Sequence, residues 1–171
     1  VTFSGDKLLG GVQAGIIVGK RELIERIHKN PMKRALRADK ITLAVLEATL
    51  KIYEDPDSLS HNIPILKIMT RPVAELEQAA QRLKSAFSTN YTCDIARAEA
   101  QIGSGALPDK TLPSLALRLR HSSMSAKDIS AQLRALPVPV VGRIKDDCVW
   151  LDLRCAEPVD ELIEQLSRLP Q

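Results

Sequence analysis

The chain has 171 residues, with 24 Lys and Arg against 21 Asp and Glu, and 44% of its residues are hydrophobic. This length suits one domain or one and a half, and the composition is that of a globular protein, which excludes disordered, collagen-like and coiled-coil classes. The apolar runs are far shorter than the roughly 18 residues that a membrane-spanning helix needs, so the sequence predicts no membrane span.

The cysteines and histidines of the chain argue against two kinds of site. Cys93, Cys148 and Cys155 are odd in number and lack a Cys-x-x-Cys spacing, so we expect neither a disulfide framework nor a tetrahedral zinc site. Reduced thiols in the cytoplasm, packed as small core residues, are the simplest interpretation. The three histidines also lack metal-ligand spacing, and we expect surface or capping positions for them.

The first 28 residues are predicted to form a hairpin followed by a short helix. Val1 to Phe3 and Ile16 to Val18 are apolar stretches separated by a glycine-rich turn, a pattern typical of two paired strands. The helix is expected from Lys20 to His28. Because the chain begins within a predicted strand and shows no signal peptide, we expect it to be the C-terminal part of a longer protein.

A long buried helix is predicted next, from Pro31 to Tyr53. Asn30 is a suitable N-cap, and proline is favoured at the first helical position. Apolar residues recur at helical spacing along two sides of this segment, which is typical of a buried helix. The two stripes consist of Ile41, Val45, Ala48 and Ile52, and of Leu43, Leu46, Leu50 and Tyr53.

Three prolines between residues 55 and 72 indicate a connection between two parts of the chain, and we place a domain boundary near residue 62. Beyond it, helices and strands alternate, which predicts a small α+β domain with one antiparallel sheet and helices on one face. Asp146 and Asp147 are expected to form a tight hairpin turn between the last two strands. The expected helices are 73–87, 125–136 and 158–169, and the expected strands are 91–100, 114–120, 138–145 and 149–154.

The strongest indication of chemistry is a lysine, Lys7, in a glycine-rich segment from Ser4 to Gly15. A lysine at the end of an apolar strand loses its proton through desolvation or a neighbouring cation, and then acts as the nucleophile that a Schiff base requires. Glycines beside it allow the backbone to approach a ring or a phosphate closely. The alternative is a surface lysine in an ordinary turn. Asp6 is expected to cap the turn rather than to transfer a proton.

Three further glycine or lysine motifs are weaker. Ser4 and Lys7 have the spacing of the penicillin-binding protein nucleophile motif, but its S-D-N and K-T-G partners are absent. Residues 15–21 resemble a P-loop but have one residue too few between the glycines and arginine in place of Ser or Thr. The glycines at 103–105 predict a loop that is more often a simple turn than a ligand site.

Residues 20–40 form a basic segment, in which eight Lys and Arg against three acidic residues give +5, in a chain with a total of +3. Arg34 and Arg37 are three residues apart, so in a helix they share a face near its N-terminus, where their charges repel. This arrangement favours a bound anion, because a helix N-terminus and arginine side chains both bind phosphate. A solvated basic face is the alternative.

Three segments together resemble bacterial selenocysteine synthase, the L-seryl-tRNA(Sec) selenium transferase family. They are FSGDKLLGGVQAGIIVG at 3–19, NPMKRALRADK at 30–40, and VGRI at 141–144 with LDLRC at 151–155. The resemblance extends over essentially all 171 residues but only over the C-terminal portion of that family. Val12 is a departure, because the family usually has proline at this position.

The resemblance implies an α/β fold-type I pyridoxal-phosphate enzyme. Residues 1–62 would be the C-terminal part of the large, cofactor-binding domain, and 63–171 the small C-terminal α+β domain. Lys7 would be catalytic and hold pyridoxal 5'-phosphate as a Schiff base, and Ser4 is a candidate for the cofactor phosphate. Arg34 and Arg37 match the arginines expected to hold selenophosphate.

The resemblance also implies the reaction and the partners. Seryl-tRNA(Sec) would be converted to selenocysteinyl-tRNA(Sec), by elimination of the serine hydroxyl and addition of selenium from selenophosphate. The complete protein would be a cytoplasmic homo-oligomer, a ring of dimers, whereas this chain alone would lack the tRNA-binding part and be inactive. Two alternatives remain open: a related pyridoxal-phosphate lyase acting on a small amino acid, and a non-catalytic part that contributes only oligomer contacts.

Overall fold

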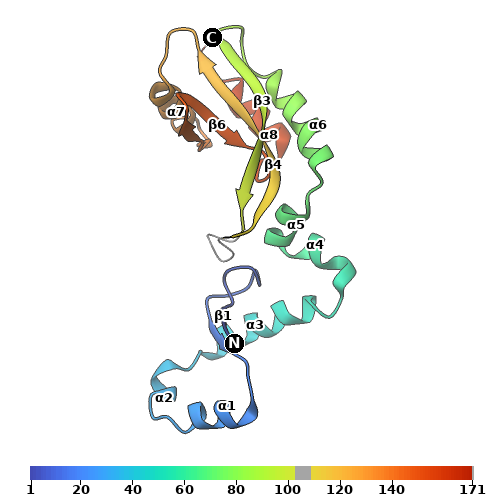
Figure 1. Ribbon diagram of the computed structural model, residues 1–171, viewed down its shortest axis with the longest axis vertical. Coiled ribbons are helices and arrows are strands. Elements are labelled where there is room, and N and C mark those ends of the chain that lie inside the picture. The colour runs from blue at the N-terminus through green and yellow to red at the C-terminus, as the bar shows by residue number, and fades with distance from the viewer. Residues whose placement is uncertain (103–108, 171) are drawn as a thin grey trace. The chain divides into compact units, whose positions relative to one another are not determined.

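The computed structural model describes residues 1–102 and 109–170 (Figure 1). The described chain divides into two compact units: the N-terminal unit, residues 1–70, and the C-terminal unit, residues 71–102 and 109–170. This division falls at residue 70, whereas the sequence predicted a boundary near residue 62. The loop predicted at residues 103–105 lies outside the described residues.

The N-terminal unit begins with the predicted hairpin. Strands β1 (Thr2–Ser4) and β2 (Gly15–Ile17) pair antiparallel, with Ser4 opposite Gly15. Helix α1 (Arg21–His28) follows, as predicted. The hairpin therefore brings Ser4 and Gly15 together at the base of the connecting loop, residues 5–14.

The single long helix predicted from Pro31 to Tyr53 is wrong in its first part. Helix α2 (Lys33–Leu36) ends after four residues, and Arg37 has an extended backbone with φ −67° and ψ 139°. Helix α3 (Lys40–Ile52) begins anew at Asp39, whose carboxylate accepts hydrogen bonds from two backbone N–H groups of its first turn. Aspartate is among the best N-caps, so Asp39 starts a second helix just before the periodic apolar residues, within the range predicted as one helix.

Helix α3 is also less buried than its two apolar stripes predicted. Among its residues, all of them described, Thr49 alone is buried, while Ile41 is 78% and Leu43 is 54% exposed. The apolar faces of α3 therefore have no complete covering layer within the described residues.

Short helices complete the N-terminal unit where the sequence predicted a proline-rich connection. They are the 3-10 helix η1 (Pro56–Ser58), α4 (Leu59–Asn62) and α5 (Pro64–Thr70). Proline is tolerated in the first turn of a helix, where its missing N–H is not needed. Two of the three helices begin at a proline, so these prolines start helices instead of preventing them.

The C-terminal unit contains a four-stranded antiparallel sheet in the order β3-β4-β6-β5 (Figure 1). The predicted α+β architecture with an antiparallel sheet and helices is confirmed for this unit. Its strands are β3 (Tyr91–Gln101), β4 (Thr111–His121), β5 (Arg143–Lys145) and β6 (Cys148–Asp152), and its helices are α6 (Val73–Lys84), α7 (Ala126–Arg134) and α8 (Val159–Leu166).

The turn between β5 and β6 was predicted correctly, but the length of β5 was not. Asp146 and Asp147 have φ values of 51° and 54°, as a two-residue type I′ hairpin turn requires, and Lys145 pairs with Cys148. The strand expected at 138–145 begins only at Arg143. Prolines flank and interrupt the preceding residues, and a proline has no N–H for a strand ladder.

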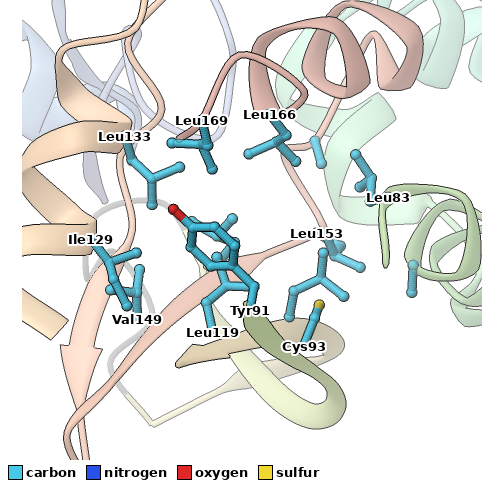
Figure 2. Close-up of a cluster of buried hydrophobic side chains, with 14 of the residues drawn as sticks. Leu83, Tyr91, Cys93, Leu119, Ile129, Leu133, Val149, Leu153, Leu166 and Leu169 are labelled. Carbon is cyan, nitrogen blue, oxygen red and sulfur yellow. The ribbon is translucent and has the colours of Figure 1, made fainter. Parts of the chain in front are cut away.

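The core of the C-terminal unit lies between one face of the sheet and the three helices. Figure 2 shows Leu119 and Val149 of the sheet packed with side chains that include Leu83, Ile129 and Leu166, one from each helix. Side chains alternate across a strand, so the neighbours of these core residues point to the opposite face. No helix among the described residues is long and apolar enough to span a membrane.

Candidate functional site

Residues 5–14 form the loop between β1 and β2, and this loop contains Lys7. The backbone N–H of Gly10 donates to the Lys7 carbonyl at 3.0 Å, and that of Gly11 donates to the Gly5 carbonyl at 2.9 Å. These hydrogen bonds fold the loop back toward its base. The backbone on both sides of Lys7 is thereby fixed.

Two glycines of the loop are required by packing within the chain. Gly10 has a φ of +71°, and a Cβ there would lie 2.6 Å from Cγ2 of Ile63. A Cβ on Gly5 would lie 2.5 Å from the carbonyl oxygen of Val12. Both distances are shorter than real Cβ contacts, so neither position accepts a larger residue without a shift of its neighbours. The glycine pattern is therefore explained by the folding of the loop itself at these positions.

Helix α3 supports the loop from one side. The Tyr53 hydroxyl, next to the end of α3, donates to the Leu9 carbonyl at 2.9 Å, and burial raises the pKa of Tyr53. Thr49, the buried residue of α3, lies against Gly11, where a Cβ would meet its side chain at 3.1 Å. Residues 5–14, hereafter the lysine loop, are thus held by their own backbone hydrogen bonds and by side chains of α3 and Tyr53, which limits the movement of the loop.

The side chains of Ser4, Asp6 and Lys7 come together in this loop. The Ser4 hydroxyl donates to one oxygen of the Asp6 carboxylate, and Lys7 Nζ donates to the other at 2.8 Å. These two bonds, that of Lys7 first, lower the pKa of Asp6 below its usual value, so Asp6 is ionised at neutral pH. Asp6 therefore positions both of the predicted site residues, which is more than the turn cap expected from the sequence.

The surroundings of Lys7 differ from those that the sequence suggested. Half of its side chain is exposed, and its charged neighbour is a carboxylate rather than a cation. Neither desolvation nor a neighbouring cation is therefore found among the described residues. The amine is accessible, and its exposed ion pair with Asp6 is of a kind that solvent and ligands readily replace.

The predicted anion site at Arg34 and Arg37 is not built as expected. Arg34 lies in α2, but Arg37 follows that helix with an extended backbone, so the two residues do not share a helical face. The long helix whose N-terminus was to support the anion begins only at Lys40. Both arginine side chains are exposed, and neither forms an ion pair within the described ranges.

The cysteines and histidines mostly occupy the positions expected. All three cysteines are free, and Cys93 and Cys148 are buried, but Cys155 is exposed, contrary to the prediction of a core position. Burial raises the pKa of the Cys93 thiol to about 11. His121 Nδ1 accepts a hydrogen bond from the Ser123 N–H at 3.1 Å, a capping contact. In the part of the chain that the structure describes, no group of three His, Cys, Asp or Glu side chains is placed to hold a metal.

Comparison with known proteins identifies the family of this chain. A family model described as L-seryl-tRNA selenium transferase matches residues 1–157. The chain belongs to this family. The L-seryl-tRNA(Sec) selenium transferase of Klebsiella pneumoniae (strain 342) is 51% identical over 176 aligned positions, which cover 98% of this chain and 38% of that protein. The enzyme of the same name from Yersinia pestis (strain Pestoides F) is 49% identical with the same coverage.

The resemblance recognised from the three sequence segments is thereby confirmed. The chain spans 38% of the length of these selenium transferases, so it corresponds to a part of the proteins that carry the name.

One cluster of side chains in this chain was not predicted from the sequence. On the sheet of the C-terminal unit, Arg118, Arg143 and Lys145 surround the ring of Trp150, with their charged groups 5.7, 5.6 and 5.4 Å from its centre. The pairing register explains it, because Trp150 lies opposite Arg118 on one side and opposite Arg143 on the other. Basic residues at alternate positions, 118 and 120, 143 and 145, were the available indication of a cationic face.

Proposed function

We propose that the complete protein is an L-seryl-tRNA(Sec) selenium transferase, which converts seryl-tRNA(Sec) to selenocysteinyl-tRNA(Sec) with selenophosphate as the selenium donor. The observation that carries this proposal is 51% identity, over 98% of this chain, to a protein of that name. The fixed loop that presents Lys7 supports it. Because the chain spans only part of such proteins, the reaction is assigned to the complete protein.

We assign pyridoxal 5'-phosphate as the cofactor, and the residues of the loop fit it. The Lys7 side chain is half exposed, and its amine is hydrogen-bonded to Asp6, so an aldehyde has access to it. The Ser4 hydroxyl bonds the same carboxylate, which places it close to the lysine as a donor for a phosphate oxygen. When bound, this cofactor supplies an electron sink that stabilises negative charge at the substrate Cα.

The residues of the loop have distinct tasks in this proposal. The Gly10 N–H holds the Lys7 carbonyl, and the hydrogen bond from Nζ to Asp6 orients the amine before the substrate arrives. With the cofactor bound, Lys7 Nζ would be the base that takes the proton from the substrate Cα. Asp6, whose pKa is lowered by its hydrogen bonds to Lys7 and Ser4, would stabilise the protonated amine of Lys7, with which it is paired in this structure. Asp6 acts as a positioning residue and gives up no proton.

Arg34 and Arg37 are proposed to bind selenophosphate. Their exposed guanidinium groups are not engaged in ion pairs within the described chain, and the segment from residue 20 to residue 40 has a net charge of +5. Arginine binds phosphate oxygens through two parallel hydrogen bonds, so each is suited to a phosphate-like anion. This proposal rests on charge and exposure, because the shared helical face is not present.

The proposed architecture of the complete protein is fold-type I, with the N-terminal unit in the large domain and the C-terminal unit as the small domain. This places the boundary at residue 70 in place of the residue 62 expected from the sequence. The exposed apolar stripes of α3 support further contacts of the N-terminal unit, since large exposed apolar surfaces mark interaction sites. We infer that they are covered by the rest of the protein or by another subunit of a cytoplasmic homo-oligomer, a ring of dimers.

Conversion assays of the complete protein test the proposal. Purified protein with pyridoxal phosphate and selenophosphate is expected to convert seryl-tRNA(Sec) to selenocysteinyl-tRNA(Sec), and to leave free serine unchanged. Turnover of free serine with no reaction on seryl-tRNA(Sec) would contradict it and would favour a lyase acting on a small amino acid.

A further inference from the structure

The two faces of the sheet in the C-terminal unit differ in what covers them. One face packs against α6, α7 and α8 through the main apolar core. The buried cluster of the other face consists of Ala116, Cys148 and Trp150, with alanines of β3 beside them, and all of these are strand residues. Within the described chain, no helix contributes to this second cluster.

Trp150 lies at the centre of the cations on this second face, which we call the open face because no helix of the described chain covers its buried cluster. Trp150 is only 9% exposed, and its Nε1 donates to the carbonyl of Lys145 at 3.2 Å, which fixes the orientation of the ring. Arg118, Arg143 and Lys145 lie over the ring, in the range where a cation is attracted to an aromatic face. Their side chains are thereby ordered before any ligand binds, which lowers the entropy lost on binding.

The charge of this face is predominantly positive. Arg118 pairs with Asp94 at 3.4 Å, and Arg120 donates through Nε to the sulfur of Cys148 at 3.0 Å. Arg143 and Lys145 are exposed and have no carboxylate partner among the described residues. A cleft of about 1050 Å³ borders the face and is lined by both of them and by Arg97, with Glu77 and Glu99 as its carboxylates. Arg120 of β4, and Arg143 and Lys145 of β5, are therefore the cations of this face that have no carboxylate partner among the described residues.

We propose that this cationic face, formed by Arg118, Arg120, Arg143 and Lys145 around Trp150, binds the phosphate backbone of the tRNA substrate. The inference rests on the proposed function, which makes tRNA the substrate, and it deepens that function by assigning an RNA contact to the C-terminal unit. Charge complementarity favours RNA, because a chain of phosphates matches several ordered cations at once. The Trp150 ring is covered by these cations, so the contact is to phosphates and not a base-stacking platform.

The test compares two double variants of the complete protein in binding to fluorescently labelled seryl-tRNA(Sec) at several salt concentrations. Arg143→Gln with Lys145→Gln removes two cations from the open face. The control, Lys127→Gln with Arg134→Gln, removes one lysine and one arginine that are exposed on α7, on the helical side of the sheet. Both pairs change exposed side chains, and thermal unfolding verifies that both variants fold.

We expect the open-face variant to bind the tRNA roughly 10- to 30-fold more weakly near physiological salt. Its slope of log affinity against log salt should fall by about 1.4 to 1.8, as two lost phosphate contacts predict. The control should stay within about twofold of the wild type, with its slope unchanged, because its cations lie away from the proposed contact.

Three outcomes would overturn the inference. One is an open-face variant with the affinity and salt slope of the wild type. Another is an equal loss in the control variant, which would indicate net charge alone. The third is polyglutamate of matched charge that competes for the face as well as RNA does, which would indicate an acidic protein partner. If the wild-type protein itself neither binds nor converts seryl-tRNA(Sec), the proposed function fails instead.

Discussion

The two units of the chain differ in how completely they bury their own apolar side chains. The C-terminal unit buries a continuous core contributed by the sheet and three helices, with Leu117, Leu119 and Leu133 fully buried. In the N-terminal unit, large apolar side chains such as Ile41 and Leu36 are more than 75% exposed. The C-terminal unit is thus stabilised from within, whereas the N-terminal unit, which contains Lys7, presents surfaces suited to further protein contacts.

The two units also have different roles in our proposals. The N-terminal unit provides the reactive lysine on a loop that α3 holds, and the C-terminal unit provides a stable sheet with one cationic face. Variants that affect one unit should therefore leave the property of the other unchanged. The following predictions test this separation, from the largest expected effect to the smallest.

Lys7→Ala should abolish both the visible absorption band of the lysine-bound cofactor and all conversion of seryl-tRNA(Sec) in the complete protein. The reason is that no other amine of the loop replaces Nζ. Absorbance and product analysis measure the effect, and the unfolding temperature should not change, because the side chain is half exposed. Lys51→Ala, at an exposed lysine of the same unit, is the control and should keep band and activity. Activity in Lys7→Ala would remove this lysine from the mechanism.

Two Leu→Ala changes test the difference in packing directly. Leu117→Ala, at a fully buried position of β4, should lower the free energy of unfolding of this chain by about 2 to 5 kcal/mol. Leu43→Ala, at a position of α3 that is 54% exposed, should change it by less than about 0.5 kcal/mol. Urea denaturation followed by circular dichroism measures both. Equal effects of the two substitutions would show that the units do not differ as described.

Arg71→Ala should destabilise the C-terminal unit through lost hydrogen bonds. The buried guanidinium donates to the carbonyls of Leu153 and Arg154 at 3.1 and 2.9 Å, and its loss should cost about 2 to 3 kcal/mol. The control is Arg82→Ala, at an exposed arginine paired with Asp160, which should cost less than about 1 kcal/mol. If denaturation gives similar values for both arginines, burial is not what makes Arg71 important.

Asp39→Ala should have the smallest effect, confined to the start of α3. Its carboxylate accepts from the N–H groups of Ile41 and Thr42, and these bonds lower its pKa. Amide hydrogen exchange of both N–H groups should accelerate in Asp39→Ala but not in Asp39→Asn, because asparagine caps equally well. Since the pKa is lowered from 3.8, the capping contribution is present above that value and is lost as the pH falls through the folded-state pKa. Unchanged exchange in Asp39→Ala would contradict this role.

The accuracy of the sequence predictions follows the same division. In the C-terminal unit, the expected strands 91–100, 114–120 and 149–154 overlap β3, β4 and β6, and the Asp146–Asp147 turn was placed correctly, because this unit packs its sheet against its own helices. In the N-terminal unit, the periodic apolar residues begin only at Ile41, within α3. The helix was extended back to Pro31 on the Asn30-Pro31 start signal, so the cap at Asp39 was missed. Its apolar stripes also predicted burial that the described residues do not provide.

The candidate site was predictable only in part, for a related reason. Ser4 and Lys7 are close in sequence, so a short loop brings them to Asp6. The cluster around Trp150 joins residues of three strands, and only the pairing register reveals that they are neighbours. Local spacing therefore indicated the lysine loop, while the cationic face required the structure.

The most direct test of the central claim is the absorption spectrum of the complete protein with pyridoxal phosphate, recorded before and after addition of seryl-tRNA(Sec). We predict a visible band that shifts with seryl-tRNA(Sec), does not shift with free serine, and is absent in Lys7→Ala. A folded protein without this band, or a band that shifts with free serine and not with seryl-tRNA(Sec), would contradict the assignment of Lys7 to selenium transfer on tRNA.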